Sequence, residues 1–566
     1  MVMVFGWKVA TLVRDGGGLV GGAVVMVNVL EEELIYLSFV TTTGFEAEAL
    51  SYDYSASIEC LAHPQNPLYN GGIIQNPELN NGLQGWTAFG DARIEHRESL
   101  GNKYVVAHRR NQAHDSVSQK IYLQKDKHYT LSAWIQVSEG NVPVTAIVKT
   151  TTRLKFAGAI FAESNCWSML KGGFTADESG PAELYFEGNN TSVEIWIDNV
   201  ALQPFTEGEW RSHQDESIEK CHNSYILNNG LYKNWFTSRF TVTTFENEMK
   251  WYSTENVQGR EDYSVADAML QFVKQHNIAV RGHNIFWDDP RYQPGWVPSL
   301  SPYQLNSAVE KRVRSVVSRY RGQLISWDVV NENLHFSFFE GKLGQAFSGR
   351  IFHEAHNIDG QTTLFLNEYN TIEDSRDGVS IPARYIQKLK KIQSYPGNAG
   401  LPIGIGLEAH FSGPGINFPY LRASIDYLAA TRLPIWITEL DVASQPRQYF
   451  ELALRELHGH PMVRGIVMWT AWSPQGCYRI CLVDNNFRNL PAGNVVDRLL
   501  SEWRLSKLSG MTDQNGFFEA NLFHGDYEME ISHPVMKNYT FTQRLQVTPI
   551  EEYFKETKQF VQLSMK

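Results

Sequence analysis

Two glutamates stand at the ends of apolar segments in the second half of the chain, each beside a polar neighbour. Asn331-Glu332 closes the segment "LISWDVVNE", and Thr438-Glu439 lies at the end of "LPIWITELD". Burying a carboxylate is costly unless other groups compensate for it. Two carboxylates that face each other are what hydrolysis of a glycosidic bond needs, one as general acid/base and one as nucleophile or base. A separation of about 5 Å would predict retention of configuration, and a larger one inversion.

Further polar residues lie near these two glutamates. Because residues two apart on a strand point the same way, Glu439 shares a face with Asp441, and Glu408 shares one with His410. A histidine held by a carboxylate could hydrogen-bond Glu439 and keep it ionised. Partial burial and the charge of the other carboxylate should keep Glu332 protonated. Glu408-x-His410 could also be half of a metal site, but no third ligand is apparent. We predict no metal and no organic cofactor.

Residues 225–507 contain the elements that must position these side chains. Seven apolar strands, each followed by a helical stretch, predict a parallel sheet. Polar residues at the carboxyl ends of the strands predict a (β/α)8 barrel with its site at that face. The strands are "RFTVTTFENE", "NIAVRGHNIFW", "LISWDVVNE", "TTLFLNEYN", "LPIGIGLEAH", "LPIWITELD" and "GIVMWTAW".

We predict that the barrel lacks its first strand, because "SHQDESIEKCHNSYIL" is a poor substitute for one. With that strand lacking, Glu332 and Glu439 close strands 4 and 7. Those strands lie across the mouth of the barrel from one another, so the two carboxylates should face each other.

The other segments have different patterns. Residues 56–206 alternate with a period of two between turns rich in Gly, Asn, Asp and Pro, which predicts an antiparallel β-sandwich of the jelly-roll type. Residues 508–566 alternate again and predict a small β unit of two or three strands followed by a tail, too little to fold alone. Residues 207–224 would be a linker with a truncated barrel start. Residues 1–55 would be a leader or a poorly ordered segment.

Composition excludes some partners. The chain has 566 residues and a net charge of −12 without a basic stripe, so we predict no nucleic-acid partner. A neutral or weakly charged substrate suits an acidic protein better. No apolar run reaches the roughly 18 residues that span a membrane, so we predict no membrane as a partner. The fifteen tryptophans fit core packing or platforms for flat ligands such as sugars. We predict a monomer.

The N-terminus and the cysteines bear on location. "LIYLSFV" followed by "AEA" is similar to the core and cleavage site of a signal peptide, but "EEE" precedes it where positive charge belongs. Any signal peptide is therefore atypical. Cys60 and Cys166 could bridge the ends of the early domain, and Cys477 and Cys481 are close enough to pair in a loop. Cys221 is then left over.

Six motifs in order resemble the glycoside hydrolase family 10 xylanases: "TTFENEMKW", "RGHNIFW", "WDVVNE", "LFLNEYN", "GIGLEAH" and "ITELD". The resemblance implies a retaining endo-1,4-β-xylanase acting on xylan or a related β-1,4-linked polysaccharide. It implies Glu332 as acid/base and Glu439 as nucleophile, oriented by His410 and Asp441. The implied sugar contacts are Glu246, Asn247 and Lys250 two subsites away on the non-reducing side, His283, Asn331 and His410 at the cleavage subsite, and Trp287 and Trp469 as its walls.

The early segment, from "NPELNNGLQGWTAFGDARI" to "VEIWIDNVALQP", resembles carbohydrate-binding module family 22. Candidate glycan contacts there are Arg110, Tyr185 and Trp196, although core packing would explain each aromatic as well. "WSPQGCYRICLVDNNFRNLPAG" matches the plant style of the barrel family. The resemblance therefore implies a secreted protein of the plant cell wall, in the apoplast.

Three departures from the family qualify this reading. Asp288 follows Trp287 where many members carry a histidine. Glu408 stands where many members carry glutamine, and the added carboxylate could raise the pKa of a neighbour. Plant relatives also carry further residues before the barrel, with a strand ending in an "FPFGCA"-like motif. We interpret Cys221 as the remnant of that motif. Either the gene model lost an exon or the protein is damaged. An open barrel exposes unpaired strand edges.

Two other functions compete with the enzyme reading. One is a catalytically inactive cell-wall protein, whose sandwich binds glycan while the truncated barrel is inert. The other is a (β/α)8 enzyme acting on small phosphorylated or metal-bound substrates. The second fails because the sequence shows no phosphate loops and no ligand clusters.

Overall fold

The structure is a computed structural model, and the chain divides into two compact units. One unit comprises 50–214 and 218–494, and the other comprises 1–49, 215–217 and 495–566. The residues that the structure describes are 9–14, 19–30, 50–211, 219–220, 224–412, 415–443, 448–469, 472–477, 479–503, 507–511, 517–532, 540–547 and 558–564.

The predicted antiparallel sandwich is confirmed. Two five-stranded sheets have the orders β10-β7-β12-β5-β4 and β3-β6-β11-β8-β9, and alternate residues of both sheets fill the core between them. The Cys60–Cys166 disulfide, expected as one possible pairing, is present. The strands are β3 (Thr87–Phe89), β4 (Arg93–Ser99), β5 (Asn102–His108), β6 (Ser116–Leu123), β7 (His128–Val137), β8 (Asn141–Lys149), β9 (Leu154–Glu163), β10 (Ser168–Thr175), β11 (Gly180–Glu187) and β12 (Ile195–Phe205).

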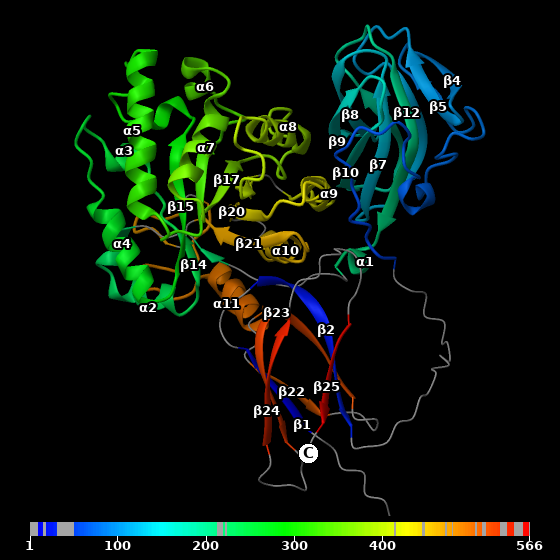
Figure 1. Ribbon diagram of the computed structural model, residues 1–566. Coiled ribbons are helices and arrows are strands. Elements are labelled where there is room, and N and C mark those ends of the chain that lie inside the picture. The colour runs from blue at the N-terminus through cyan, green and yellow to red at the C-terminus, as the bar shows by residue number, and fades with distance from the viewer. Residues whose placement is uncertain are drawn as a thin grey trace, which may run out of the picture. The chain divides into compact units, whose positions relative to one another are not determined.

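The barrel region is a curled parallel sheet (Figure 1), as predicted. Its strand order is β13-β21-β20-β18-β17-β16-β15-β14, and the short β19 (His410–Phe411) pairs with β20. The strands are β13 (Glu219–Lys220), β14 (Val242–Thr244), β15 (Ala279–Trp287), β16 (Ser326–Asn331), β17 (Thr363–Glu368), β18 (Ile403–Leu407), β20 (Ile435–Val442) and β21 (Val463–Met468).

A short strand occupies the place where the first barrel strand seemed to be lacking. The two residues of β13 pair in parallel with Val467 and Met468 of β21, and β13 also contacts β14. In the described part of the chain, β13 and β14 nevertheless remain the two ends of the hydrogen-bonded order. The seven longer strands are those that the apolar segments predicted. Cys221 lies outside the described residues.

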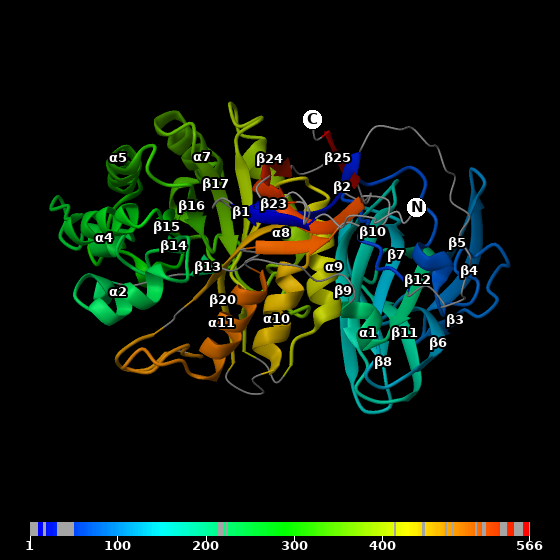
Figure 2. The ribbon, with the colours of Figure 1, turned by 90° about the horizontal axis from the view of Figure 1, so that it is seen from below.

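Helices between the strands cover the outside of the curled sheet, as Figure 2 shows for α4, α5 and α7. No helix in the described part of the chain combines the length and the apolar character needed to cross a membrane. The helices are α1 (Glu207–Arg211), α2 (Gly230–Thr237), α3 (Trp251–Thr254), α4 (Ser264–Gln275), α5 (Pro302–Tyr320), α6 (Phe338–Leu343), α7 (Phe347–Ile358), α8 (Pro382–Gln393), α9 (Phe418–Ala429), α10 (Gln448–His458) and α11 (Pro491–Trp503).

Helix α5 contributes a buried arginine that fixes loops at the mouth. The helix begins with a capping box, in which Ser301 and Gln304 satisfy each other's backbone N–H groups. Arg312, fully buried on its inner face, donates hydrogen bonds to the backbone oxygens of Met249 and Asn284 at 2.6 and 3.1 Å. This guanidinium therefore holds two segments that carry predicted site residues.

Sandwich and barrel meet in a buried polar junction within one unit. Lys171 on β10 and Asp426 on α9 form an ion pair of 2.7 Å, and neither side chain is exposed. Lys171 Nζ also donates to the backbone oxygens of Asp53 and Ser55, each at 2.8 Å. Asp426 also accepts from the Tyr52 hydroxyl at 2.7 Å. Every charge at this contact is therefore hydrogen-bonded to an opposite charge or a dipole.

A second ion pair extends this junction. Arg422 on α9 makes a bidentate contact with Glu456 on α10 at 2.6 and 2.8 Å. Trp210 of α1 donates its indole N–H to the same carboxylate at 3.0 Å. The Arg422 guanidinium also lies 3.8 Å from the centroid of the Trp210 ring. The helix that follows the sandwich is thus fixed to the barrel helices.

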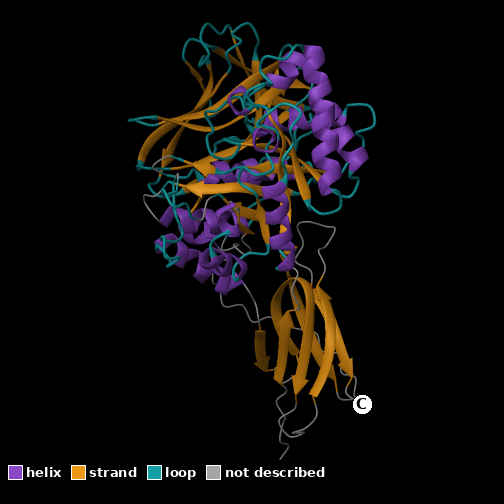
Figure 3. Cartoon of the chain, turned by 90° about the vertical axis from the view of Figure 1, so that its left-hand side faces the viewer, coloured by secondary structure: helices purple, strands orange, loops and turns teal. Residues whose placement is uncertain are grey.

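The second unit is a sheet built from strands of both terminal segments, as Figure 3 shows. Strands β1 and β2 pair with strands near the C-terminus in the order β22-β1-β23-β2-β25, and β24 pairs with β23. Residues 1–55 were predicted to be a leader or a poorly ordered segment. The run similar to a signal peptide lies in 31–49, outside the described residues, so the leader stays a prediction. An isolated pair of strands is only marginally stable, so partners distant in sequence complete the sheet. The strands are β1 (Val9–Arg14), β2 (Leu19–Leu30), β22 (Lys507–Met511), β23 (Phe517–Ser532), β24 (Thr540–Val547) and β25 (Lys558–Ser564).

Candidate active site

The carboxyl ends of the barrel strands surround a cleft of about 990 Å³. Glu332, directly after β16, and Glu439, on β20, both line it. Nine further residues expected to bind the substrate or orient the nucleophile also line it, although the sequence places them on different segments. They are Glu246, Asn247, Lys250, His283, Trp287, Asn331, His410, Asp441 and Trp469.

Glu332 has an unusual backbone conformation for a non-glycine residue. Its φ is 55°, in the left-handed region, which costs about 1–3 kcal/mol and persists only where the surroundings impose it. Its backbone N–H donates to the Asn367 carbonyl at 2.9 Å, so the neighbouring strand holds the turn. This turn ends strand β16 while leaving the carboxyl group in the cleft.

The environment of Glu332 favours its protonated form. Burial raises the pKa of its carboxyl group to about 8, and the charges of Glu368 and Glu439 add to the increase. Lys250 acts in the opposite direction but does not cancel it. Glu332 can therefore carry a proton at neutral pH, as a general acid must.

The environment of Glu439 favours its ionised form. Burial alone would raise the pKa of this carboxyl group, but the charge of His283, the hydrogen bond and charge of His410, and the charge of Lys250 lower it to about 2. His283 Nε2 lies 3.8 Å from Oε1, and His410 Nε2 lies 3.5 Å from Oε2. Asn367 also donates to Oε1 at 3.0 Å. Glu439 is thus a buried anion available for nucleophilic attack.

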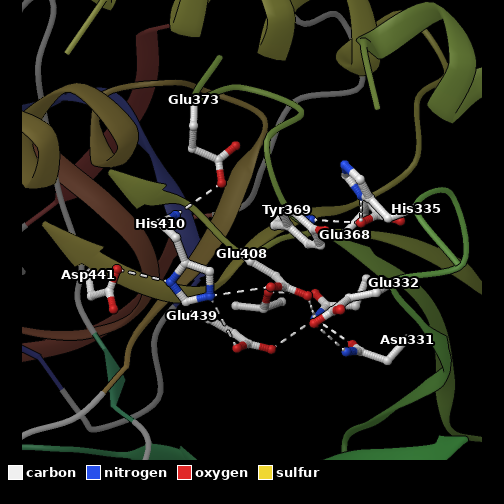
Figure 4. A network of polar contacts seen from close by, with 12 residues as sticks. Asn331, Glu332, His335, Glu368, Tyr369, Glu373, Glu408, His410, Glu439 and Asp441 are labelled. Atoms are coloured by element: carbon white, nitrogen blue, oxygen red, sulfur yellow. Dashed lines mark hydrogen bonds and ion pairs between the residues drawn. The ribbon is translucent and has the colours of Figure 1, made fainter. Parts of the chain in front are cut away.

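Carboxylates on the far side of the two histidines orient their rings. His410 Nδ1 lies 2.9 Å from Asp441 Oδ1, so Nε2 points to Glu439, as Figure 4 shows. His283 Nδ1 lies 2.9 Å from Asp328 Oδ2, and Asp328 is itself paired with Arg281 at 2.7 Å. The sequence motifs identified Asp441 but not Asp328 in this role. Asp328 lies three residues before Asn331 on the same strand, within the quoted motif "WDVVNE".

A close contact in the barrel interior supports the strand that carries His283. Gly282 lies against the indole ring of the buried Trp327, and a Cβ at this position would come within 2.3 Å of that ring. Only glycine lets β15 and β16 approach in this way. Position 282 thereby fixes the depth of the next residue, His283.

Asn367 at the end of β17 connects the polar residues of the cleft. Its amide nitrogen donates to Asn331 Oδ1, Glu408 Oε1 and Glu439 Oε1 at 2.8, 3.1 and 3.0 Å. Its amide oxygen accepts from the Thr438 hydroxyl at 2.5 Å. The motif "LFLNEYN" contains this residue, but its role was not predicted. A polar residue that closes a buried strand was the available signal.

Glu408 is the third carboxylate beside the nucleophile. Burial, together with the charges of Glu439 and Glu332, raises its pKa well above the ordinary value. The sequence showed no third metal ligand beside Glu408 and His410, but the structure brings Glu439 to them. One possible ligand atom of each of the three residues lies within 4.8 Å of the other two. His410 Nε2 lies 3.3 Å from Glu408 and 3.5 Å from Glu439. Hydrogen bonds account for this arrangement, and the absence of a metal stays a prediction.

Aromatic rings and a lysine form one end of the cleft. Lys250 Nζ lies 4.4 Å from the centroid of Trp287 and 5.7 Å from that of Trp469. Trp287 stacks on Tyr292 with centroids 4.0 Å apart and rings 4° from parallel. Such rings can hold the flat faces of sugars, while Lys250 and Asn247 offer polar contacts. Sequence reasoning missed four cleft residues here and nearby, namely Tyr252, Tyr292, Tyr369 and Arg479.

The loop after β21 closes another side of the cleft. Cys477 and Cys481 form a disulfide, which confirms the pairing expected from their spacing. Cys477 lines the cleft, and the nearby Arg479 donates hydrogen bonds to Asp441 and Ser412. The disulfide thus ties the loop that delivers Arg479 to the carboxylate behind His410.

The sandwich corrects one predicted glycan contact. Arg110 is buried, and its guanidinium donates hydrogen bonds to five backbone carbonyl oxygens, including those of Gly188 at 2.5 Å and Asp115 at 2.7 Å. It therefore holds loops together and has no donor left for a sugar. A buried arginine cannot be told from a binding arginine by residue type alone.

The two aromatic candidates of the sandwich are also packed. Tyr185 is 2% exposed, stacks on Phe89 with centroids 3.9 Å apart, and donates its hydroxyl to Glu187 at 3.0 Å. Trp196 is half-buried, stacks on Tyr104 and donates its indole N–H to Glu194 at 3.0 Å. Glycan binding by Tyr185 and Trp196 stays a prediction.

The mouth of the curled (β/α)8 barrel holds two carboxyl groups, one with a raised and one with a lowered pKa. This combination is typical of the class of barrels that hydrolyse glycosides. Residues 212–497 match the model of "Glycosyl hydrolase family 10", and residues 71–192 match that of a "Carbohydrate binding domain". The chain belongs to glycosyl hydrolase family 10, as the six sequence motifs predicted. The family number of the binding module stays a prediction.

Curated relatives cover most of the chain. "Endo-1,4-beta-xylanase 5-like" of Arabidopsis thaliana is 34% identical over an alignment of 552 residues that covers 89% of this chain and 94% of the relative. "Endo-1,4-beta-xylanase 5" of the same plant is 37% identical over an alignment of 477 residues that covers 76% of this chain and 84% of the relative. A solved structure of the N-terminal endo-1,4-beta-D-xylanase 10B of Clostridium thermocellum with xylohexaose is 18% identical, with a TM-score of 0.42, and covers 77% of this chain and 97% of that one.

Proposed function

We propose that the protein hydrolyses internal β-1,4-xylosidic linkages of plant cell-wall xylan with retention of configuration. The observation that carries the proposal is the pair of carboxyl groups in one cleft, with the pKa of Glu332 raised to about 8 and that of Glu439 lowered to about 2. Two roles in one reaction need such a difference, since one group must give a proton while the other attacks as an anion.

The proposed reaction has two steps. Glu439 attacks the anomeric carbon and forms a covalent glycosyl-enzyme bond, while Glu332 protonates the oxygen of the leaving sugar. Glu332, now ionised, then takes a proton from water, which attacks the same carbon and releases Glu439. Asn331, held by Asn367 at 2.8 Å, is placed to hydrogen-bond the sugar hydroxyl beside the nucleophile. His410 keeps Glu439 oriented in both steps.

Substrate and location are parts of the same proposal. The Arabidopsis relatives are named endo-1,4-beta-xylanases, and the chain carries a carbohydrate-binding domain in addition to the family 10 barrel. Two disulfides favour a secreted protein, because such bonds persist in oxidising compartments. We therefore place the proposed activity in the apoplast, with a monomer acting on xylan.

The test is release of reducing ends from xylan by the purified full-length chain. The wild type should release them, and nuclear magnetic resonance should show the β-anomer first. Glu439→Gln should abolish release, whereas Glu98→Gln, which changes an exposed carboxylate of the sandwich, should leave it unchanged. If Glu332→Gln and Glu439→Gln each keep the wild-type rate, the assignment of the two roles is wrong.

The rival function is a xylan-binding wall protein without catalysis. It is favoured by the two-residue length of β13, because strands that close a barrel also set the alignment of residues across its mouth. A folded wild type that binds insoluble xylan but releases no reducing ends would establish the rival. Release that depends on Glu439 would exclude it.

A further inference from the structure

His335 lies three residues after Glu332, and both nitrogens of its ring face carboxylates. Nδ1 is 2.7 Å from Glu368 Oε1, and Nε2 is 2.9 Å from Asp377 Oδ2. An ionised carboxylate can only accept, so both ring nitrogens donate and the ring is an imidazolium. Burial opposes this charge, but the bonds to Glu368 and Asp377 outweigh it and raise the pKa of His335 to about 9.

The clamped ring lies directly against a tyrosine of the cleft. His335 and Tyr369 stack with centroids 3.8 Å apart and rings 10° from parallel. Tyr369 lines the cleft together with Glu332, and Figure 4 shows both near His335, opposite His410 and Asp441. His335 itself is not among the residues that line the cleft. The direct route from His335 to a bound sugar is therefore through Tyr369, against which its ring stacks.

Glu368 connects the stacked rings of His335 and Tyr369 to the backbone that follows Glu332, the proposed acid. The Glu368 side chain is unexposed and accepts from the backbone N–H groups of Leu334 at 2.7 Å and Tyr369 at 3.1 Å. The same carboxylate thus holds His335, the turn after Glu332 and the start of the loop after β17. Asp377 fixes the opposite side of the imidazolium and also accepts from Asn370 at 2.8 Å.

We propose that His335 is a positioning residue that fixes the Tyr369 ring as the platform for the departing sugar. The inference rests on the proposed function, in which the leaving sugar lies beside Glu332, the acid that protonates its oxygen. Tyr369 lies on that side of the cleft. A ring held from beneath does not lose side-chain freedom when a sugar binds, so the platform is organised in advance.

The first measurement compares two substrates that share the sugars bound before the cleaved bond. Xylohexaose leaves a sugar on the Tyr369 side, whereas β-xylobiosyl fluoride has a leaving group of one atom. His335→Gln should lower kcat/KM for xylohexaose about 3- to 10-fold, the effect of one side chain that is no longer held in place. It should change kcat/KM for the fluoride less than about twofold. His276→Gln, at an exposed histidine of the barrel, is the matched control and should change neither.

A double-mutant cycle tests whether His335 acts through the tyrosine. In a Tyr369→Ala background, His335→Gln should cause no further loss on xylohexaose. Additive losses, equal losses on both substrates, or no loss for the single variant would each overturn the proposal. Asp377→Asn removes the anion from one side of the clamp and should produce a smaller loss in the same direction, so a poorly folded His335→Gln does not end the test.

A binding assay separates this inference from failure of the proposed function. If the wild type cleaves neither substrate, the proposed function fails. Calorimetric binding of xylohexaose to Glu439→Gln and to the double variant with His335→Gln then still tests the platform. Affinity reduced by about 3- to 10-fold supports it, and equal affinity overturns it.

Discussion

The mouth of the barrel and the junction between sandwich and barrel both bury charged side chains, but they balance charge differently. At the junction, Lys171 pairs with Asp426 and Arg422 pairs with Glu456, so cations and anions match. At the mouth, Glu332, Glu408 and Glu439 lie close enough to shift one another's pKa values. A matched pair stabilises one arrangement of helices, whereas neighbouring carboxylates cannot all be ionised.

The two regions differ in whether their buried charged groups stabilise or destabilise the fold. Glu332 has a left-handed backbone and a carboxyl group whose ionised form is disfavoured, and both features cost stability. Asp426 is more deeply buried, yet Lys171 and His460 hold its pKa below the ordinary value against the effect of burial. The stability that the junction contributes can therefore offset the stability lost at the mouth. Substitutions in the two regions should have opposite signatures.

The largest effect is expected for Glu332→Gln. Loss of the proposed general acid should lower kcat on xylan by about 10²- to 10⁴-fold. Thermal unfolding should occur at an equal or higher temperature, because a neutral amide replaces a disfavoured carboxyl group. Rate and melting temperature are measured on the same preparation. A lower melting temperature would show that the mouth is stabilised by its charges, as the junction is.

A loss of nearly the same size, but in stability, is expected for Lys171→Met. Removing one partner of a buried pair leaves Asp426 uncompensated and should reduce the free energy of unfolding by about 3–5 kcal/mol. The rate per folded molecule should stay unchanged, since Lys171 does not line the cleft. Urea unfolding followed by tryptophan fluorescence measures the loss. Lys171→Met combined with Asp426→Leu should recover part of it, and failure to recover would assign the loss to packing.

The two regions should also respond to opposite ends of the pH range. The proton of Glu332, the proposed general acid, is lost as pH rises through its raised pKa of about 8, so kcat/KM should fall about tenfold per pH unit above that value. Asp426 has a lowered pKa, so its contribution to stability is present above the unfolded value of about 3.9 and is lost as pH falls through the folded value. Rates and circular dichroism across pH 3–10 separate these effects. Alkaline inactivation that coincides with unfolding would contradict this.

The smallest effect is expected at an exposed ion pair of the sandwich. Arg153 and Asp177 lie 2.9 Å apart with side chains 61% and 44% exposed. Arg153→Gln should change the free energy of unfolding by less than about 0.5 kcal/mol, because solvent screens such pairs. The same urea assay serves as the control for Lys171→Met. A loss comparable to that of Lys171 would mean that burial does not explain the junction.

Periodicity predicted the sandwich and the seven longer barrel strands because their core faces are continuous in sequence. It did not predict that β1 and β2 would pair with β23, since partners some hundreds of residues apart leave no local signal. The two residues of β13 are too few to show a period. Motif spacing predicted Glu332 and Glu439 but not Asn367. An asparagine that connects several strands cannot be recognised from any one of them.

The sequence by itself determined which residues stand at the strand ends, and with them the class of chemistry, because side-chain alternation is a local property of the backbone. Only the tertiary structure decided which carboxylate keeps its proton, because burial and neighbouring charges come from separate strands. It also placed Arg110 among backbone carbonyls, where a sugar contact was expected, and set His335 beneath Tyr369. Those outcomes depend on which side chains meet in space.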